Sequence, residues 1–173
     1  RSLLHFLKYW KIHVCWRIFR RLKMGPGWFL FSKAFDSISH PKLLLKLSSY
    51  GFKYELLYWI KTFLEGREQC VLIDGHQSES CLVTSGVVQG SCIGPLLFII
   101  FINDIVDLLD KPATSKLFAD DIKLYSRIEN PADNPVASTL HKIVDWSKTW
   151  QMKLNPSKST IMKIGTLKSE FSY

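Results

Sequence analysis

The stretch KLFADDIKLYS, Lys116 to Ser126, decides the fold of this chain. Two short apolar runs, residues 116–119 and 122–126, flank the pair Asp120-Asp121, which predicts two strands joined by a tight turn. Adjacent carboxylates repel each other in a low-dielectric setting, so such a turn is open to solvent or neutralised by a divalent cation. Asp is also an ordinary turn residue, and a solvated turn is the simpler interpretation of this pair taken alone.

The segments around the turn predict a mixture of strands and helices. Upstream we expect a strand at 28–31, a helix from Ser39-His40-Pro41 to just before Gly51, a helix at 54–64, and strands 69–73 and 80–84 joined around Asp74-Gly75. Downstream we expect a helix at 95–109, a helix from Pro135 and a strand at 160–164. This order predicts an α+β fold whose largely antiparallel sheet packs on helices.

The chain has 173 residues, of which 47% are hydrophobic, and this is enough for one domain with a sizeable core. Its net charge is +8, and the whole excess lies in residues 1–35, which contain no Asp or Glu. We expect residues 1–27 to be a basic segment that is unrelated to the domain or disordered, ending at the breaker Gly25-Pro26-Gly27. The domain then spans 28–166, and 167–173 form a tail.

The cysteines and the hydropathy exclude several classes of protein. No two of the four Cys have the spacing of a zinc knuckle, and the pattern favours a reducing, intracellular compartment. No apolar run reaches the length that spans a bilayer, so we expect no membrane partner.

Three further strings accompany FADD in a fixed order. They are FSKAFDSISH (31–40), GVVQGSCIGPLLF (86–98) followed by Ile102-Asn103-Asp104, and LNPSK (154–158). Together with FADD they resemble motifs A, B, C and D of the reverse transcriptases of non-LTR retrotransposons, the jockey-like LINE elements. The resemblance covers residues 29–165.

The resemblance implies a polymerase palm that copies an RNA template from a DNA primer with deoxynucleotides, using two Mg²⁺ ions. It makes Asp120 and Asp121 both catalytic residues and metal ligands. It places Lys158 beside the departing pyrophosphate, although this residue taken alone is an ordinary surface lysine. Asp36 is interpreted as a cap of the following helix, and Asp104 and Asp107 as members of a solvated helix face.

The same resemblance implies a nucleotide- and template-binding set made of Phe35, Gln89 and Gly90. Phe35 matches the aromatic residue that stacks beneath the incoming sugar and rejects a 2′-hydroxyl group; simple core packing is the alternative. Gln89 and Gly90 match the loop that lies against the nucleotide and the template, where glycine lets the backbone approach a ligand closely.

The sequence departs from the family pattern at Leu30, where motif A has the Asp that bridges both metal ions. A leucine supplies no oxygen to Mg²⁺, so we expect a defective polymerase. Val88 replaces a family proline, and nothing in the chain resembles the fingers or the thumb. The alternative function is a non-catalytic nucleic-acid-binding module that uses a basic arm at residues 1–23.

Overall fold

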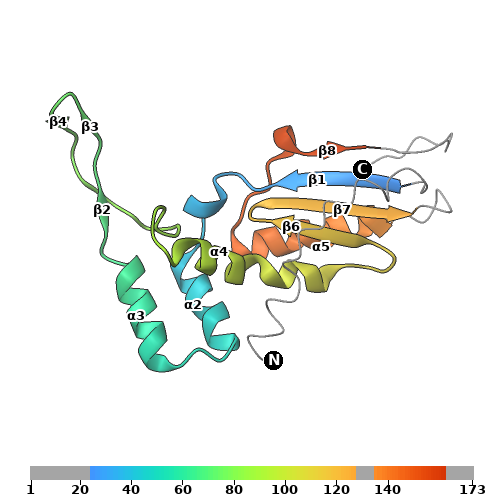
Figure 1. Cartoon of the computed structure of the whole chain (residues 1–173), viewed down its shortest axis with the longest axis horizontal. Helices are drawn as coiled ribbons and strands as arrows, with labels where there is room; N and C mark the ends of the chain where they lie inside the picture. Colours follow the sequence, from blue (N-terminus) through green and yellow to red (C-terminus); the bar gives the residue numbers. More distant parts are fainter. Residues whose placement is uncertain (1–23, 128–134, 163–173) are drawn as a thin grey trace.

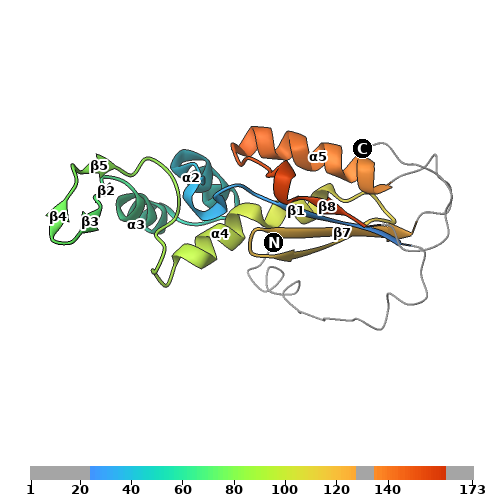
Figure 2. The same cartoon turned by 90° about the horizontal axis from the view of Figure 1, so that it is seen from above.

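The computed structural model describes residues 24–127 and 135–162 (Figure 1). A four-stranded sheet forms one half of the molecule. Its strands are β1 (Met24–Leu30), β6 (Thr114–Phe118), β7 (Asp121–Arg127) and β8 (Thr160–Ile161), in the order β6-β7-β1-β8. Every pairing in this sheet is antiparallel, which confirms the predicted sheet type. The α5 helix (Pro135–Trp150) lies across one face of the sheet (Figure 2).

Three further helices form the other half. The α2 helix (His40–Ser49) packs against both α3 (Tyr54–Leu64) and α4 (Gly94–Ile102). The α4 helix is apolar all round and lies in the middle of the molecule, as such helices do. It continues as a 3₁₀ helix, η4 (Asn103–Leu108), so the predicted helix at 95–109 changes its winding at residue 103. Two shorter 3₁₀ helices, η3 (Ala34–Asp36) and η5 (Pro156–Lys158), precede α2 and β8.

The core lies where the sheet, α2, α4 and α5 meet. Its fully buried apolar side chains come from all of these layers: Ile38, Leu43, Leu47, Phe98, Phe101, Ile105, Ile122, Leu124, Ile143 and Met152. No described helix has both the length and the apolar composition needed to cross a membrane.

The β1 strand begins at Met24, whereas the sequence predicted a start at Trp28. Its residues pair one by one with β7, from Met24 opposite Arg127 to Leu30 opposite Asp121. The Gly-Pro-Gly breaker therefore lies inside a strand, and the boundary predicted at residue 27 falls within β1. Proline is tolerated here because β8 pairs only with Gly27 and Trp28, which leaves the β1 backbone at Pro26 without a partner on that side among the described residues.

Residues 65–82 form a two-stranded arm that extends away from the helices (Figures 1 and 2). It contains β2 (Glu68–Gln69) paired with β5 (Cys81–Leu82), and β3 (Leu72–Ile73) paired with β4 (His76–Gln77). The predicted hairpin around Asp74-Gly75 is confirmed, and both turn residues have positive φ angles, 49° and 82°. Every residue of the arm is exposed.

A buried lysine joins three helices in the interior. The Lys46 side chain is 3% exposed, and its ammonium group donates to the Phe101 carbonyl and, at 2.6 Å, to Asp104 Oδ1. Asp104 also accepts a hydrogen bond from Trp146 Nε1 at 3.1 Å. The prediction that Asp104 belongs to a solvated helix face is therefore wrong.

Candidate active site at one end of the sheet

The FADD turn lies at the end of the sheet that faces the helices. Phe118 closes β6, Asp121 opens β7, and the two residues are paired across the hairpin. The loop between them is Ala119 and Asp120, and Ala119 has the left-handed φ of 50° that such a two-residue loop requires. Asp121 is exposed and Asp120 is half-buried. The predicted strand-turn-strand is confirmed, and both carboxylates lie at the tip of the sheet.

Leu30 is the residue directly across the sheet from Asp121. It closes β1, and the β1–β7 register makes the two residues partners. Within residues 24–127 and 135–162, no three His, Cys, Asp or Glu side chains form a group that could hold a metal ion. The side chains present therefore do not fit the two-ion cage that the motif resemblance implies, because a leucine stands where a third carboxylate would complete it.

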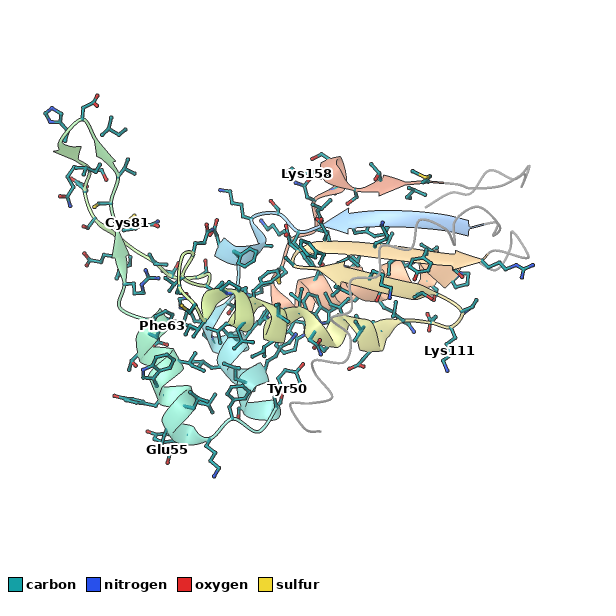
Figure 3. The ribbon with its side chains drawn as sticks, in the orientation of Figure 1. Tyr50, Glu55, Phe63, Cys81, Lys111 and Lys158 are labelled. Atoms are coloured by element: carbon teal, nitrogen blue, oxygen red, sulfur yellow. The ribbon has the colours of Figure 1, made fainter. Side chains whose placement is uncertain are left out.

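Two backbone hydrogen bonds hold the segment that carries Lys158 against the end of β1. The Asn155 amide donates to the Leu30 carbonyl at 2.7 Å, and the Ser32 amide donates to the Lys153 carbonyl at 2.7 Å. Lys158 ends η5, and its side chain is exposed above the end of β1 (Figure 3). The fold thus places Lys158 at the same end of the sheet as the FADD turn.

The three predicted nucleotide-binding residues line one pocket. Phe35, Gln89 and Gly90 surround a hollow of about 240 Å³ together with Val88, Gly94 and Pro95. The Phe35 ring stacks on Phe98, with centroids 4.2 Å apart and planes 18° from parallel. Phe35 therefore has one face against the core while it also lines the pocket, so the packing role and the binding role are compatible.

Close backbone contacts hold motif B against motif A behind this pocket. The Gly86 amide donates to the Ile38 carbonyl at 2.8 Å, and the Val87 amide donates to the Phe35 carbonyl at 2.8 Å. The buried His40 ring is hydrogen-bonded through Nε2 to the Gly86 carbonyl at 2.8 Å. These bonds fix the start of the loop that continues to Gln89.

Asp36 contacts this loop rather than the helix that follows it. Its carboxylate accepts a hydrogen bond from Gln89 Nε2 at 2.7 Å. The N-cap of α2 is Ser39, and no side chain caps that end. The predicted capping role of Asp36 is therefore wrong. Sequence reasoning also missed His40, because its partner is 46 residues away and leaves no local signal.

Comparison with known proteins decides the family. The family model described as reverse transcriptase (RNA-dependent DNA polymerase) matches residues 29–173. The chain belongs to the reverse transcriptase family. Among curated reverse transcriptases, it is 29% identical over 134 residues to the RNA-directed DNA polymerase of the mobile element jockey from Drosophila melanogaster. It is 32% identical over 145 residues to the probable RNA-directed DNA polymerase of transposon BS from the same species.

These matches cover 73% and 79% of the chain but only 14% and 16% of the two relatives. The chain thus spans about one seventh of the length of these retrotransposon reverse transcriptases. Enzymes of this family generally use divalent metal ions.

Solved telomerase structures share the fold. The match to apo telomerase from Candida tropicalis, truncated from its C-terminal domain, covers 96% of this chain and 35% of the telomerase chain. Its TM-score is 0.64 and the sequences are 13% identical. The match to telomerase from Candida albicans, solved in complex with a fragment of telomeric RNA, covers 87% of this chain and 28% of the telomerase chain. Its TM-score is 0.63 and the sequences are 14% identical. The α+β reverse transcriptase fold is therefore confirmed.

Proposed function

We propose that this chain is the palm of an RNA-directed DNA polymerase of a non-LTR retrotransposon, and that Leu30 makes it defective in polymerisation. The observation that supports the palm role most strongly is spatial. The FADD turn, Lys158 and η3, which carries Phe35, come from distant parts of the sequence and lie around one end of the sheet. An RNA template, a DNA primer and deoxynucleotides are the partners that suit this arrangement.

Each residue has a role that its position supports. The Phe35 ring, supported by Phe98, forms an apolar wall on which a nucleotide sugar rests. The Gln89 carboxamide is oriented by Asp36, and the Gly90 backbone borders the same pocket. Lys158 presents an exposed positive charge at the end of the sheet, suited to a phosphate that carries negative charge.

The proposed defect follows from the missing carboxylate. Mg²⁺ takes hard oxygen ligands in a tight octahedron. Asp120 and Asp121 offer two carboxylates, while Leu30 offers only methyl groups at the paired position of β1. Phosphoryl transfer that depends on two ions requires a bridging ligand which these side chains do not provide.

Binding of Mn²⁺ tests this proposal without requiring catalysis. We expect the wild-type chain to bind Mn²⁺ weakly and Leu30→Asp to bind it at least tenfold more tightly, because a third carboxylate then faces Asp121. The free Mn²⁺ signal in electron paramagnetic resonance measures this affinity. The matched control is Leu30→Asn, which has a similar size and no charge and should gain much less.

Two outcomes contradict the proposal. Equal Mn²⁺ affinity in the wild type and Leu30→Asp would mean that residue 30 does not face a metal site. Clear cDNA synthesis by the wild-type chain, in primer extension on an RNA template, would show that Leu30 does not disable the polymerase.

A further inference from the structure

Asp36 lies next to Phe35 in η3, and its carboxylate contacts the loop that carries Gln89 and Gly90. Asp36 Oδ1 accepts a hydrogen bond from Gln89 Nε2 at 2.7 Å, although the two residues are 53 positions apart in the chain. Phe35, Gln89 and Gly90 line the pocket. The Asp36 carboxylate therefore acts on a ligand in the pocket through Gln89.

The backbone of Asp36 is held from both motifs. Its amide donates to the Lys33 carbonyl at 3.0 Å within motif A, and its carbonyl accepts from Ser85 Oγ at 2.8 Å, just before motif B. Gly86 lies so close that a Cβ there would be 2.7 Å from the Asp36 Cα. Because its backbone is fixed in this way, Asp36 loses little conformational freedom when its carboxylate holds Gln89.

The chemistry of a carboxylate decides how the Gln89 carboxamide is turned. A carboxylate accepts hydrogen bonds and donates none, so it pairs with the amide nitrogen of Gln89. Turning the carboxamide by half a turn would place Gln89 Oε1 against Asp36 Oδ1, and two acceptors repel each other. Within the part of the chain that the structure describes, no donor is hydrogen-bonded to Gln89 Oε1. Asp36 thus leaves the carbonyl oxygen of Gln89 as the end with unused capacity.

An acceptor beside the Phe35 wall distinguishes between ligands. A deoxynucleotide carries one free hydroxyl group on its sugar, the 3′-hydroxyl, and this group can donate to a carbonyl oxygen. A nucleotide without it would cover Gln89 Oε1 and leave the oxygen unpaired, which costs binding free energy.

We propose that Asp36 is a specificity-determining residue of the pocket. By holding Gln89 Nε2 it directs Gln89 Oε1 toward the sugar, and the pocket therefore prefers a nucleotide that has a 3′-hydroxyl group to one that lacks it. This role rests on the proposed function, in which the sugar of a nucleotide lies against Phe35. Asp36 is a positioning residue, because it touches Gln89 and acts on the ligand through it.

A comparison of two nucleotides tests the preference. The probes are deoxyadenosine triphosphate and 2′,3′-dideoxyadenosine triphosphate, titrated into the full chain while nuclear magnetic resonance follows the backbone amides of Gln89 and Gly90. We expect the wild type to bind the first about fivefold more tightly, which corresponds to one net hydrogen bond. The ratio of the two affinities cancels any general effect of protein charge on the triphosphate.

Three variants separate positioning from charge. Asp36→Ala should bring the affinity ratio close to one, because the Gln89 carboxamide can then turn either way. Asp36→Glu retains a carboxylate and should keep most of the preference. Asp107→Ala removes the same charge at an exposed position of η4 and should leave the ratio unchanged.

The side-chain amide of Gln89 reports its orientation without any ligand. In the free wild type, its two amide protons should be more widely separated in chemical shift than those of the exposed Gln151, because one of them is hydrogen-bonded to a carboxylate. Asp36→Ala should reduce this separation to that of Gln151. Gln89→Leu, which removes the two signals, assigns them.

Binding of both nucleotides with equal affinity by the wild type overturns the preference while it leaves the nucleotide-binding function intact. An affinity ratio that Asp36→Ala does not change overturns the role of Asp36. If neither nucleotide shifts the amides of the loop, the proposed function fails instead. The free Gln89 signals then decide the positioning role, which is overturned if Asp36→Ala leaves their separation unchanged.

Discussion

At the scale of single residues, Lys46 shows how a buried charge is tolerated. Burial lowers the pKa of its ammonium group to about 8, and the hydrogen bond and the charge of Asp104 only partly oppose this. The ammonium group also lies over the rings of Phe101, Trp146 and Trp150, the nearest centroid at 3.9 Å. These contacts compensate for part of the lost hydration of the cation, but not for all of it.

The free energy of unfolding should therefore depend on pH in the alkaline range. Unfolded Lys46 has its ordinary pKa near 10.5, so between about pH 8 and pH 10 the unfolded state binds more protons than the folded state. The free energy of unfolding should rise across this window, by at most about 1.4 kcal/mol per pH unit. Urea denaturation at a series of pH values measures it.

The Lys46→Met variant is the control for this titration and should lose the rise. Above pH 10 the trend should reverse, because burial and the charges of Asp104 and Asp107 raise the pKa of Tyr50 to about 12 in the folded state. The unfolded state then loses the Tyr50 proton first, which favours unfolding. A wild-type stability that is flat or falls between pH 8 and pH 10 would contradict the assignment.

Single-residue roles were the least predictable from sequence. Asp36 was expected to cap a helix, and Asp104 was expected to belong to a solvated helix face. Their partners, Gln89 and Lys46, are 53 and 58 residues away. The pairing of Leu30 with Asp121 was predictable only from the order of the motifs, because the resemblance places FADD and FSKAFD in one site.

At the scale of elements, the helix signals were reliable and one strand signal was not. The predicted helix at 54–64 matches α3, and Pro135 opens α5 as expected, because apolar spacing and end signals agree there. The start of β1 was missed because Gly25-Pro26-Gly27 normally breaks a strand. Pairing with β7 along its whole length holds β1 together despite these residues.

The contact between motifs A and B depends on the glycine at position 86. Gly86 has a φ of 90°, and a Cβ built there would lie 2.7 Å from the Asp36 Cα and 2.9 Å from its carbonyl oxygen. Gly86→Ala should therefore lower the free energy of unfolding by about 3 kcal/mol, because backbone strain and a steric clash add together. Urea denaturation followed by circular dichroism measures the change.

Gly51→Ala is the matched control, since Gly51 has a φ of 87° and open space around its Cβ position. Gly51→Ala should lower the free energy of unfolding by only about 1 kcal/mol, because it adds backbone strain alone. Equal losses in the two variants would show that the segments of motifs A and B are not in close contact.

At the scale of the whole molecule, the core and the arm are separable. The buried apolar residues lie in the sheet, the helices and the segments that connect them, and none comes from residues 65–82. The arm begins and ends at one point, because the Val83 amide donates to the Arg67 carbonyl at 2.8 Å. Residues 67 and 83 can therefore be joined by a two-residue hairpin turn.

Replacing residues 68–82 with Asn-Gly should leave the core intact. We expect the free energy of unfolding, measured by urea denaturation, to change by no more than a mutation at an exposed surface site causes, about 0.5 kcal/mol, because no core contact is lost. Loss of cooperative unfolding in this variant would mean that the arm supports the fold itself.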